Sequence, residues 1–301
     1  MKRRTAGRHR LAAGGIFWST LRSLDHTQRF LIVLLTLLGV FMLLPIVYVF
    51  NHAFKPLQEL FLFPPTFFVH QPTLDNFTEL FSFSDQSFIP MTRYILNSLI
   101  ISAVSTIGMV VFGALCAYPL SKHPFPGRKL IFGLILVSLM VSVEAMGIPR
   151  YLVVRQLDIM NTYWGHILPI LALPLGVFLL KQFMDQMPDE LIEAAKIDGA
   201  SEFRVFTAIV LPVVSPAVAT LIILAFQTAW GNTETSQLFM QDEAMKSWPY
   251  FVGSLTTNLA NNVARQGAAA AAALILFIPN LIIFLISQRK VIQTMAHSGI
   301  K

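Results

Sequence analysis

A run of 21 residues without a charge, Phe30–Phe50, constrains this chain more than any other feature. As an α-helix the run is about 31 Å long, which matches a bilayer hydrocarbon core of roughly 30 Å. Such a segment is typical of a membrane-spanning helix. The composition agrees, because only 13% of the residues are charged, about half the share usual in soluble domains.

Five further apolar stretches predict five more spans, and several contain proline, which neighbouring helices make tolerable in a membrane. They are Ile95–Leu120, Leu130–Pro149, Tyr163–Leu180, Val213–Trp230 and Gly267–Ser287. The sequence therefore predicts an all-α membrane protein with six transmembrane helices, occupying residues 30–287.

The basic residues predict the orientation. Lys and Arg number sixteen in the N-terminal tail 1–29, the loops 121–129 and 181–212 and the tail 288–301, against six in the other loops. Cytoplasmic loops carry the excess of Lys and Arg, so we expect both tails to be cytoplasmic. This distribution explains the net charge of +6 better than nucleic-acid binding does, and Cys116, the only cysteine, forms no internal disulfide.

Two outward segments could contact partners. The long, aromatic loop 51–94 contains Pro64-Pro65 and Pro72, which argue against one long helix. It is either a folded lid on the helix bundle or a receiver for an extracytoplasmic protein. The polar segment Gly231–Arg265 is a second possible docking surface.

The loop 181–212 has the most informative sequence. Asp189 and Glu190 follow Pro188 and suit a helix N-terminus, whereas Gly199 predicts a left-handed C-cap that ends the helix. Ser201 can cap a second short helix that leads to Leu211-Pro212. Six acidic against three basic residues would be repelled by anionic lipid. We therefore expect a helix–turn–helix on the cytoplasmic face that binds a protein.

The same loop resembles a known family. Glu193-Ala194-Ala195, then Gly199, then Ile209-x-Leu211-Pro212 reproduce the EAA signature of ATP-binding-cassette importer permeases, with seven fixed positions over twenty residues. Other stretches are similar to the carbohydrate-uptake branch, the maltose-type second permease subunit: Asn97-Ser98, Tyr118-x-Leu120-Ser121, Phe125-Pro126-Gly127-Arg128 and Asn161-Thr162-Tyr163-Trp164.

The resemblance implies a type I importer permease fold in which this loop is the coupling helix. Glu193, Ala194, Ala195 and Gly199 would form the docking face and turn, and Ile209, Leu211 and Pro212 would join them to the fifth span. The implied partners are a homologous second permease, an ATPase dimer carrying ATP and Mg, and an extracytoplasmic solute-binding protein.

The residues give no sign of catalysis by this chain. No Gly-x-x-x-x-Gly-Lys-Ser/Thr phosphate cradle occurs, so ATP hydrolysis must be supplied by a separate chain. The seven histidines are scattered, and we predict no metal site, no bound cofactor and no catalytic residue.

Four residues are candidates for the substrate path. Glu144 is an acid inside the third predicted span, where charge is costly. It either lines the path or its outer gate, or reaches interfacial water or Arg150. Trp230, Asn232 and Glu234 follow the fifth span, and aromatic and polar side chains of this kind suit sugars.

We therefore expect the permease subunit of a binding-protein-dependent sugar or oligosaccharide importer in a bacterial cytoplasmic (inner) membrane, working by alternating access. A permease for a polyamine or glycerol phosphate, and a non-transporting scaffold or sensor subunit, stay open as alternatives. An integral membrane enzyme would need a paired acid and base at membrane depth, and no span offers one.

Overall fold

The computed structural model describes residues 25–85, 89–259 and 266–298. This part of the chain is helical and contains no strand, which confirms the predicted class. The elements are α2 (His26–Ala53), α3 (Leu57–Leu60), α4 (Asp75–Asp85), α5 (Met91–Lys122), α6 (Arg128–Ser138), a 3-10 turn η1 (Glu144–Met146), α7 (Gly147–Gln156), α8 (Tyr163–Leu171), α9 (Pro174–Asp185), α10 (Glu190–Ile197), α11 (Glu202–Val205), a π-helical turn η2 (Phe206–Val210), α12 (Leu211–Val213), α13 (Ser215–Trp230), α14 (Glu234–Phe239), a 3-10 turn η3 (Glu243–Met245), α15 (Trp248–Leu259) and α16 (Gln266–Ser298).

Three helices of the described chain are long and apolar enough to cross a membrane: α2, α5 and the first part of α16, residues 266–288. Two bent pairs raise the number to five if each pair is one span. They are α8 with α9, bent by 44°, and the segment 202–213 with the segment 215–239, bent by 82°. The protein is therefore a multi-pass membrane protein.

The third predicted span, Leu130–Pro149, is not one helix. α6 ends at Ser138 after 11 residues, about 16 Å of helix, and the backbone bonds of Leu139, Met140 and Val141 have an i to i−3 pattern. Pro149 then lies in the first turn of α7, where its missing N–H costs nothing. Glu144 consequently opens a short exposed turn rather than lying within a spanning helix.

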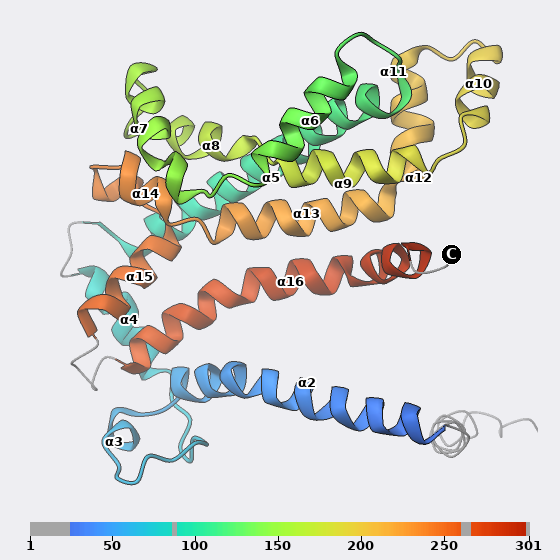
Figure 1. The fold of residues 1–301 in the computed structure, drawn as a ribbon. Coiled ribbons are helices and arrows are strands. Elements are labelled where there is room, and N and C mark those ends of the chain that lie inside the picture. Colours follow the sequence, from blue (N-terminus) through green and yellow to red (C-terminus); the bar gives the residue numbers. More distant parts are fainter. Residues whose placement is uncertain (1–24, 86–88, 260–265, 299–301) are drawn as a thin grey trace, which may run out of the picture.

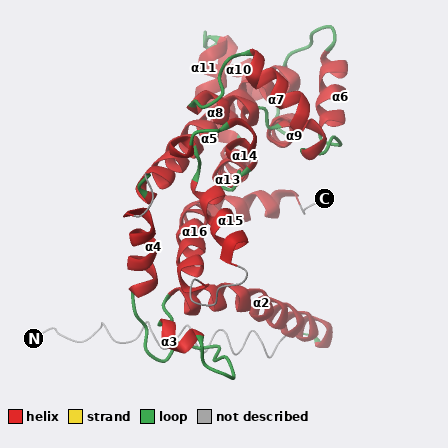
Figure 2. Ribbon diagram, turned by 90° about the vertical axis from the view of Figure 1, so that its left-hand side faces the viewer, coloured by secondary structure: helices red, strands yellow, loops and turns green. Residues whose placement is uncertain are grey.

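The long helices lie side by side around α5 (Figure 1). α5 packs against α8, α9 and α13, α13 packs against α16, and α16 packs against α2. Figure 2 views this arrangement from the end that carries α14 and α15 and shows α2 at the margin, beyond α16. Most of α2 is exposed on all sides, as expected for a helix surrounded by lipid.

The two ends of the molecule differ in content. The α10 end contains the start of α2, the segment between α5 and α6, helices α10 and α11, and the last described residues of α16 (Figure 1). The α15 end contains α3, α4, α14 and α15. This grouping matches the predicted division of the loops between two sides, while the sidedness itself stays a prediction.

One buried asparagine joins three elements at the α15 end. The Asn76 amide on α4 donates to the carbonyls of His52, Ala53 and Lys55, at 3.3, 3.0 and 2.7 Å, and its side chain is buried. Gly267, at the start of α16, lies against the same amide, and a Cβ there would come within 2.1 Å of the Asn76 Oδ1. α4 therefore folds onto the helix bundle.

Replacing Gly267 with Ala is expected to lower the free energy of unfolding by about 1–3 kcal/mol, because Asn76 must withdraw and leave buried carbonyls without a donor. The measurement is thermal unfolding of the detergent-solubilised chain. Gly133→Ala is the matched control, since a Cβ at Gly133 meets nothing within 4 Å. Equal unfolding temperatures for Gly267→Ala and Gly133→Ala would contradict this role of the Asn76 amide.

Candidate functional site

The helix of the predicted coupling loop is α10, which starts at Glu190, two residues after Pro188. Gly199 ends it in the left-handed region, with φ +81°. The N–H of Gly199 donates to the carbonyl of Lys196, and the N–H of Ala200 donates to that of Ala195, both at 3.0 Å. This pair of bonds is a Schellman motif, and the predicted glycine stop is confirmed.

The chain returns to the helix bundle through an irregular segment. Ser201 precedes α11 in an extended conformation, although its side chain makes no capping hydrogen bond. The π-helical turn η2, which contains Ile209, follows, then α12 with Leu211 and Pro212, and then the 82° bend into α13. Buried side chains of η2 belong to the same hydrophobic core as α5, α9 and α13. The segment between α10 and α13 is therefore packed helix rather than a loose linker.

α10 has an inward and an outward face. Ile192 and Ala195, three residues apart, are buried in that core. Ala195 is therefore not part of the exposed face, whereas Glu193, Ala194 and Gly199 are exposed. Ile197, which is 86% exposed, also lies on the exposed face and was not predicted from the sequence. Its spacing of three from Ala194 is the signal that could have placed it there.

Polar contacts hold the start of the loop to the end of α5. The Lys122 ammonium donates to the Asp189 carboxylate and to the carbonyl of Met187, both at 2.6 Å. The Ser121 hydroxyl donates to the Asp185 carboxylate at 2.6 Å. Charge-assisted bonds of this kind are short and directional, so they fix the position of α10 relative to α5.

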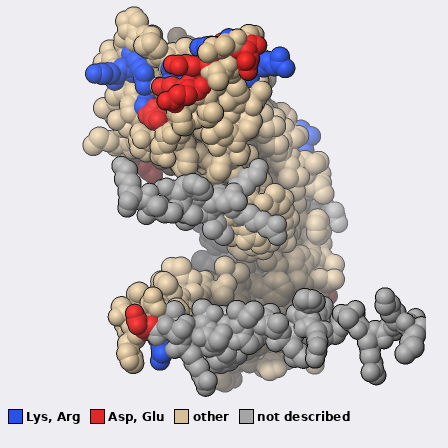
Figure 3. Space-filling view, turned by 90° about the vertical axis from the view of Figure 1, so that its right-hand side faces the viewer, with Lys and Arg blue, Asp and Glu red and all other residues tan. Residues whose placement is uncertain are grey.

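The carboxylate of Glu202 gathers three more contacts behind α10. It accepts a 2.5 Å hydrogen bond from the Tyr118 hydroxyl, pairs with Lys196 at 3.0 Å and lies 2.8 Å from the His123 Nε2. Figure 3, which faces the α10 end, shows charged side chains gathered over this part of the molecule. The exposed face of the loop therefore carries both charged and apolar side chains. Its inner face is held in place by hydrogen bonds and ion pairs.

The second candidate site lies at the opposite end and brings two predicted path residues together. Glu144 and Glu234 both line a pocket of about 520 Å³. Its lining residues are Val143, Glu144, Gly147, Ile148, Tyr151, Glu234, Gln237 and Leu238. Arg150 pairs with Glu234 at 3.1 Å and not with Glu144. Within the described part of the chain no hydrogen bond or ion pair engages the Glu144 carboxylate, which leaves it open to the pocket.

Trp230 and Asn232 have structural positions instead. Trp230 is 1% exposed, its indole N–H donates to the Leu276 carbonyl at 2.8 Å, and it stacks on Phe226. It faces α16 and is not among the residues that line the pocket shared by Glu144 and Glu234. The Asn232 Oδ1 accepts from the N–H and the hydroxyl of Thr235 at 2.9 and 2.7 Å, which stabilises the start of α14.

A buried polar network lies beside this pocket, and the sequence did not predict it. His166 is fully buried and contacts the Thr235 hydroxyl at 2.8 Å and the Met245 carbonyl at 3.0 Å. The Asn97 amide donates to the carbonyls of Ala244 and Lys246, both at 2.9 Å. These bonds attach the segment 232–248 to α5 and α8, so this part of the predicted docking segment has a fixed shape.

Lys246 extends this buried network. Burial lowers the pKa of its ammonium, but hydrogen bonds to the Glu243 carboxylate and the Tyr250 hydroxyl outweigh burial and raise that pKa above the ordinary value. Lys246 therefore stays positively charged at neutral pH, and its charge is already matched by Glu243.

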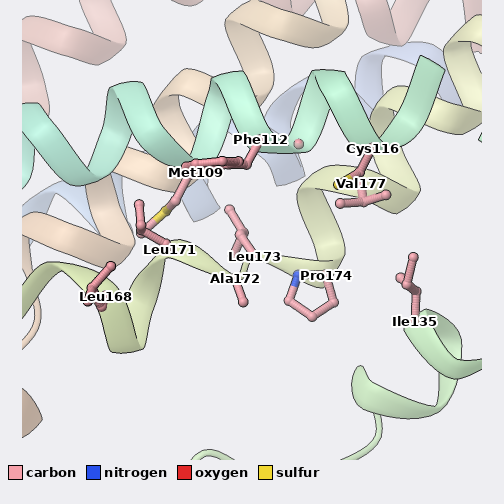
Figure 4. A pocket seen from close by; sticks show the side chains of 11 residues that line it. Met109, Phe112, Cys116, Ile135, Leu168, Leu171, Ala172, Leu173, Pro174 and Val177 are labelled. Atoms are coloured by element: carbon pink, nitrogen blue, oxygen red, sulfur yellow. The ribbon is translucent and has the colours of Figure 1, made fainter. Parts of the chain in front are cut away.

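Two further observations concern the ligands that the described residues could bind. A pocket of about 460 Å³ between α5, α6 and the α8–α9 bend is lined by apolar side chains and the Cys116 thiol (Figure 4), so it offers no polar groups for a hydrated solute. Among the described residues no group of three or more His, Cys, Asp or Glu could hold a metal ion.

Comparison with known proteins identifies the class that this fold and loop define. Residues 109–295 match the family described as binding-protein-dependent transport system inner membrane component, and the chain belongs to this family. It is a permease component of an ATP-binding-cassette transport system. Its role is therefore transport, and it is not an enzyme.

Individual relatives agree. The chain is 28% identical to the arabinooligosaccharides transport system permease protein AraQ of Bacillus subtilis, over 92% of this chain and 99% of AraQ. It is 36% identical to protein LplC of the same species, over 70% and 68%. It is 29% identical to the trehalose transport system permease protein SugB of Mycobacterium tuberculosis, over 89% and 96%.

A solved structure supports the fold. A chain of a bacterial ATP-binding-cassette transporter that imports the acidic polysaccharide alginate superposes with a TM-score of 0.73 at 19% identity, covering 88% of this chain and 98% of that one. At this identity the likeness concerns the fold, which is that of a type I importer permease.

The Arg150–Glu234 pair is expected to behave as a coupled pair, because each half-buried side chain neutralises the other. Arg150→Ala and Glu234→Ala should each destabilise the protein, and the double variant should lose about 0.5–1 kcal/mol less than the sum of the two. Unfolding midpoints of the four proteins in detergent provide the cycle. If the two single losses of stability simply add in the double variant, the ion pair contributes nothing to the free energy of unfolding.

Proposed function

We propose that this chain is the permease subunit of an ATP-driven, binding-protein-dependent importer of sugars or oligosaccharides that works by alternating access. The observation that carries the proposal is the coupling loop. α10 presents an exposed face, while its other face and its polar anchors are attached to α5 and the core.

The coupling loop is connected to the spanning helices in two ways. A force on α10 reaches α5 through the Lys122–Asp189 ion pair and through Glu202, which contacts both Lys196 and Tyr118. It reaches α13 through the packed segment 202–213. Closure of a partner ATPase dimer, which would hold ATP and Mg, would therefore tilt α5 and α13 together. Ile197 and Ala194 would contact that partner directly, with Glu193 pairing with a basic group.

A neutral, hydroxyl-rich solute suits the pocket near α14. Carboxylates, an amide and the Tyr151 hydroxyl line it, and sugars are bound by such groups together with aromatic faces. Arg150 neutralises Glu234, so the pocket lacks the dense negative charge that a polyamine needs. The unpaired Glu144 carboxylate would repel a phosphate. The names of AraQ and SugB, which specify arabinooligosaccharides and trehalose, support the same class.

The proposed topology has six crossings, with α6 and the irregular segment 139–146 forming the third. The tails 1–29 and 288–301 are cytoplasmic, and the membrane is the bacterial cytoplasmic (inner) membrane. The excess of Lys and Arg in these tails supports this orientation, as does the grouping of the described helix ends in Figure 1.

Purification of the tagged chain in mild detergent should recover an ATPase, a homologous second permease and, when added or co-expressed, an extracytoplasmic solute-binding protein. Mass spectrometry identifies them, and calorimetry with the purified binding protein tests neutral sugars against polyamines and glycerol phosphate. Recovery of the chain alone would favour a scaffold or sensor role. If the binding protein binds a polyamine or glycerol phosphate instead, the chain would still belong to an importer, but not to a sugar importer.

A substitution pair at Gly199 tests the role of the loop. Gly199→Val should lose ATPase recovery, because a β-branched residue in the left-handed region costs at least about 1–2 kcal/mol and would unwind the end of α10. Gly199→Asn is the matched control, since Asn tolerates this conformation. Co-purified ATPase is quantified for equal amounts of inserted permease. Normal recovery with Val would contradict the proposed docking role of the turn.

A further inference from the structure

The segment 57–69, which follows α2, presents apolar side chains outward. Phe63 is 94% exposed, Phe68 64% and Phe61 61%, with Leu57 and Leu62 about half exposed. Residues 60–69 contain no charged residue. An aromatic surface of this kind is unusual on a face in contact with water.

The charges next to this segment are turned inward. Lys55 is 1% exposed, and its ammonium donates to the Thr66 carbonyl at 2.5 Å. Glu59 is 8% exposed and accepts from the N–H groups of His70 and Gln71 at 3.2 and 2.9 Å. The segment thus folds over the charges of Lys55 and Glu59 and exposes its large apolar side chains.

The internal bonds keep this arrangement in one shape. The Asn51 side chain at the end of α2 accepts from the Val69 N–H at 3.1 Å, and the Thr73 N–H donates to the Phe54 carbonyl at 2.9 Å. Burial raises the pKa of the Glu59 carboxyl, but the two N–H donors outweigh it and hold that pKa below its usual value. The carboxylate therefore stays charged and bonded at neutral pH.

The position of the segment relative to the membrane follows from chain length. α2 ends at Ala53, and α3 starts at Leu57, so the segment begins where this exposed apolar helix leaves the hydrocarbon. Figures 1 and 2 place α3 beside that end of α2, away from α14 and the upper helices. The ring of Phe67 lies 6.0 Å from that of Tyr48 on α2 and 5.1 Å from that of Phe68, which places Phe68 beside the exposed surface of α2.

We propose that the segment 57–69 is a membrane anchor that lies in the boundary between headgroups and acyl chains, with Phe61, Phe63 and Phe68 inserted into lipid. The inverted pattern favours lipid over a protein partner, because every charge that could guide a protein contact is already used inside the segment. The anchor fixes the end of α2, which packs against α16, at a defined depth. This inference does not depend on the transported solute.

The single cysteine makes a direct test simple. In a Cys116→Ala background, Phe63→Cys and Phe68→Cys are labelled with a nitroxide, and the full chain is placed in nanodiscs of phosphatidylcholine and phosphatidylglycerol. Collision with oxygen reports lipid, and collision with a water-soluble nickel chelate reports water. Gln58→Cys is the matched control, since Gln58 is an exposed polar residue on α3.

Labels at 63 and 68 should collide mainly with oxygen, at a depth of roughly 5–10 Å below the headgroups, while the label at 58 should collide more with the nickel chelate. Equal nickel access at 58 and 63 would place the aromatics in water and overturn the proposal. Protection of 63 and 68 from both reagents, in nanodiscs that contain the partner subunits, would show that a protein covers them and would also overturn it.

Discussion

The attachment of α10 and α11 to the end of α5 is the interaction on which the rest of the account depends. Glu202 contacts Tyr118, His123 and Lys196, and Asp189 pairs with Lys122. These bonds convert a short surface helix into part of the helix bundle. In the proposed mechanism, an α10 without these bonds could be displaced by the ATPase while the spanning helices stayed in place.

The bilayer imposes the second constraint, since each buried polar group must find a partner inside the protein. At the α15 end Asn76, Asn97 and His166 satisfy it, because their side chains bond to backbone carbonyls of neighbouring elements, whereas the indole N–H of Trp248 has no partner in the described chain. The loops at this end are therefore held in place by hydrogen bonds, whereas the Glu144 carboxylate lies open beside the pocket. The same constraint turns the charges of the segment 57–69 inward.

Structural features that depend on neighbouring residues in the sequence were predicted. α2 extends the predicted span by only a few residues, and Gly199 ends α10 as its conformation requires. Features set by distant contacts were not predictable. Ala195 is turned toward a hydrophobic core that also contains residues of α5 and α9, and Glu234 pairs with a residue 84 positions away. The break after Ser138 was missed because an apolar run has the same composition whether or not its helix is continuous.

In the proposed mechanism α10 presents its outward face to an ATPase on the cytoplasmic side. Cross-linking in membranes tests it most directly, using Ile197→Cys and Gln58→Cys, two exposed positions at opposite ends of the molecule, each in a Cys116→Ala background. With a thiol-to-amine cross-linker and a co-expressed ATPase, the account predicts an ATPase adduct from position 197 and none from 58. An adduct from 58, or none from 197 with the ATPase bound, would contradict it.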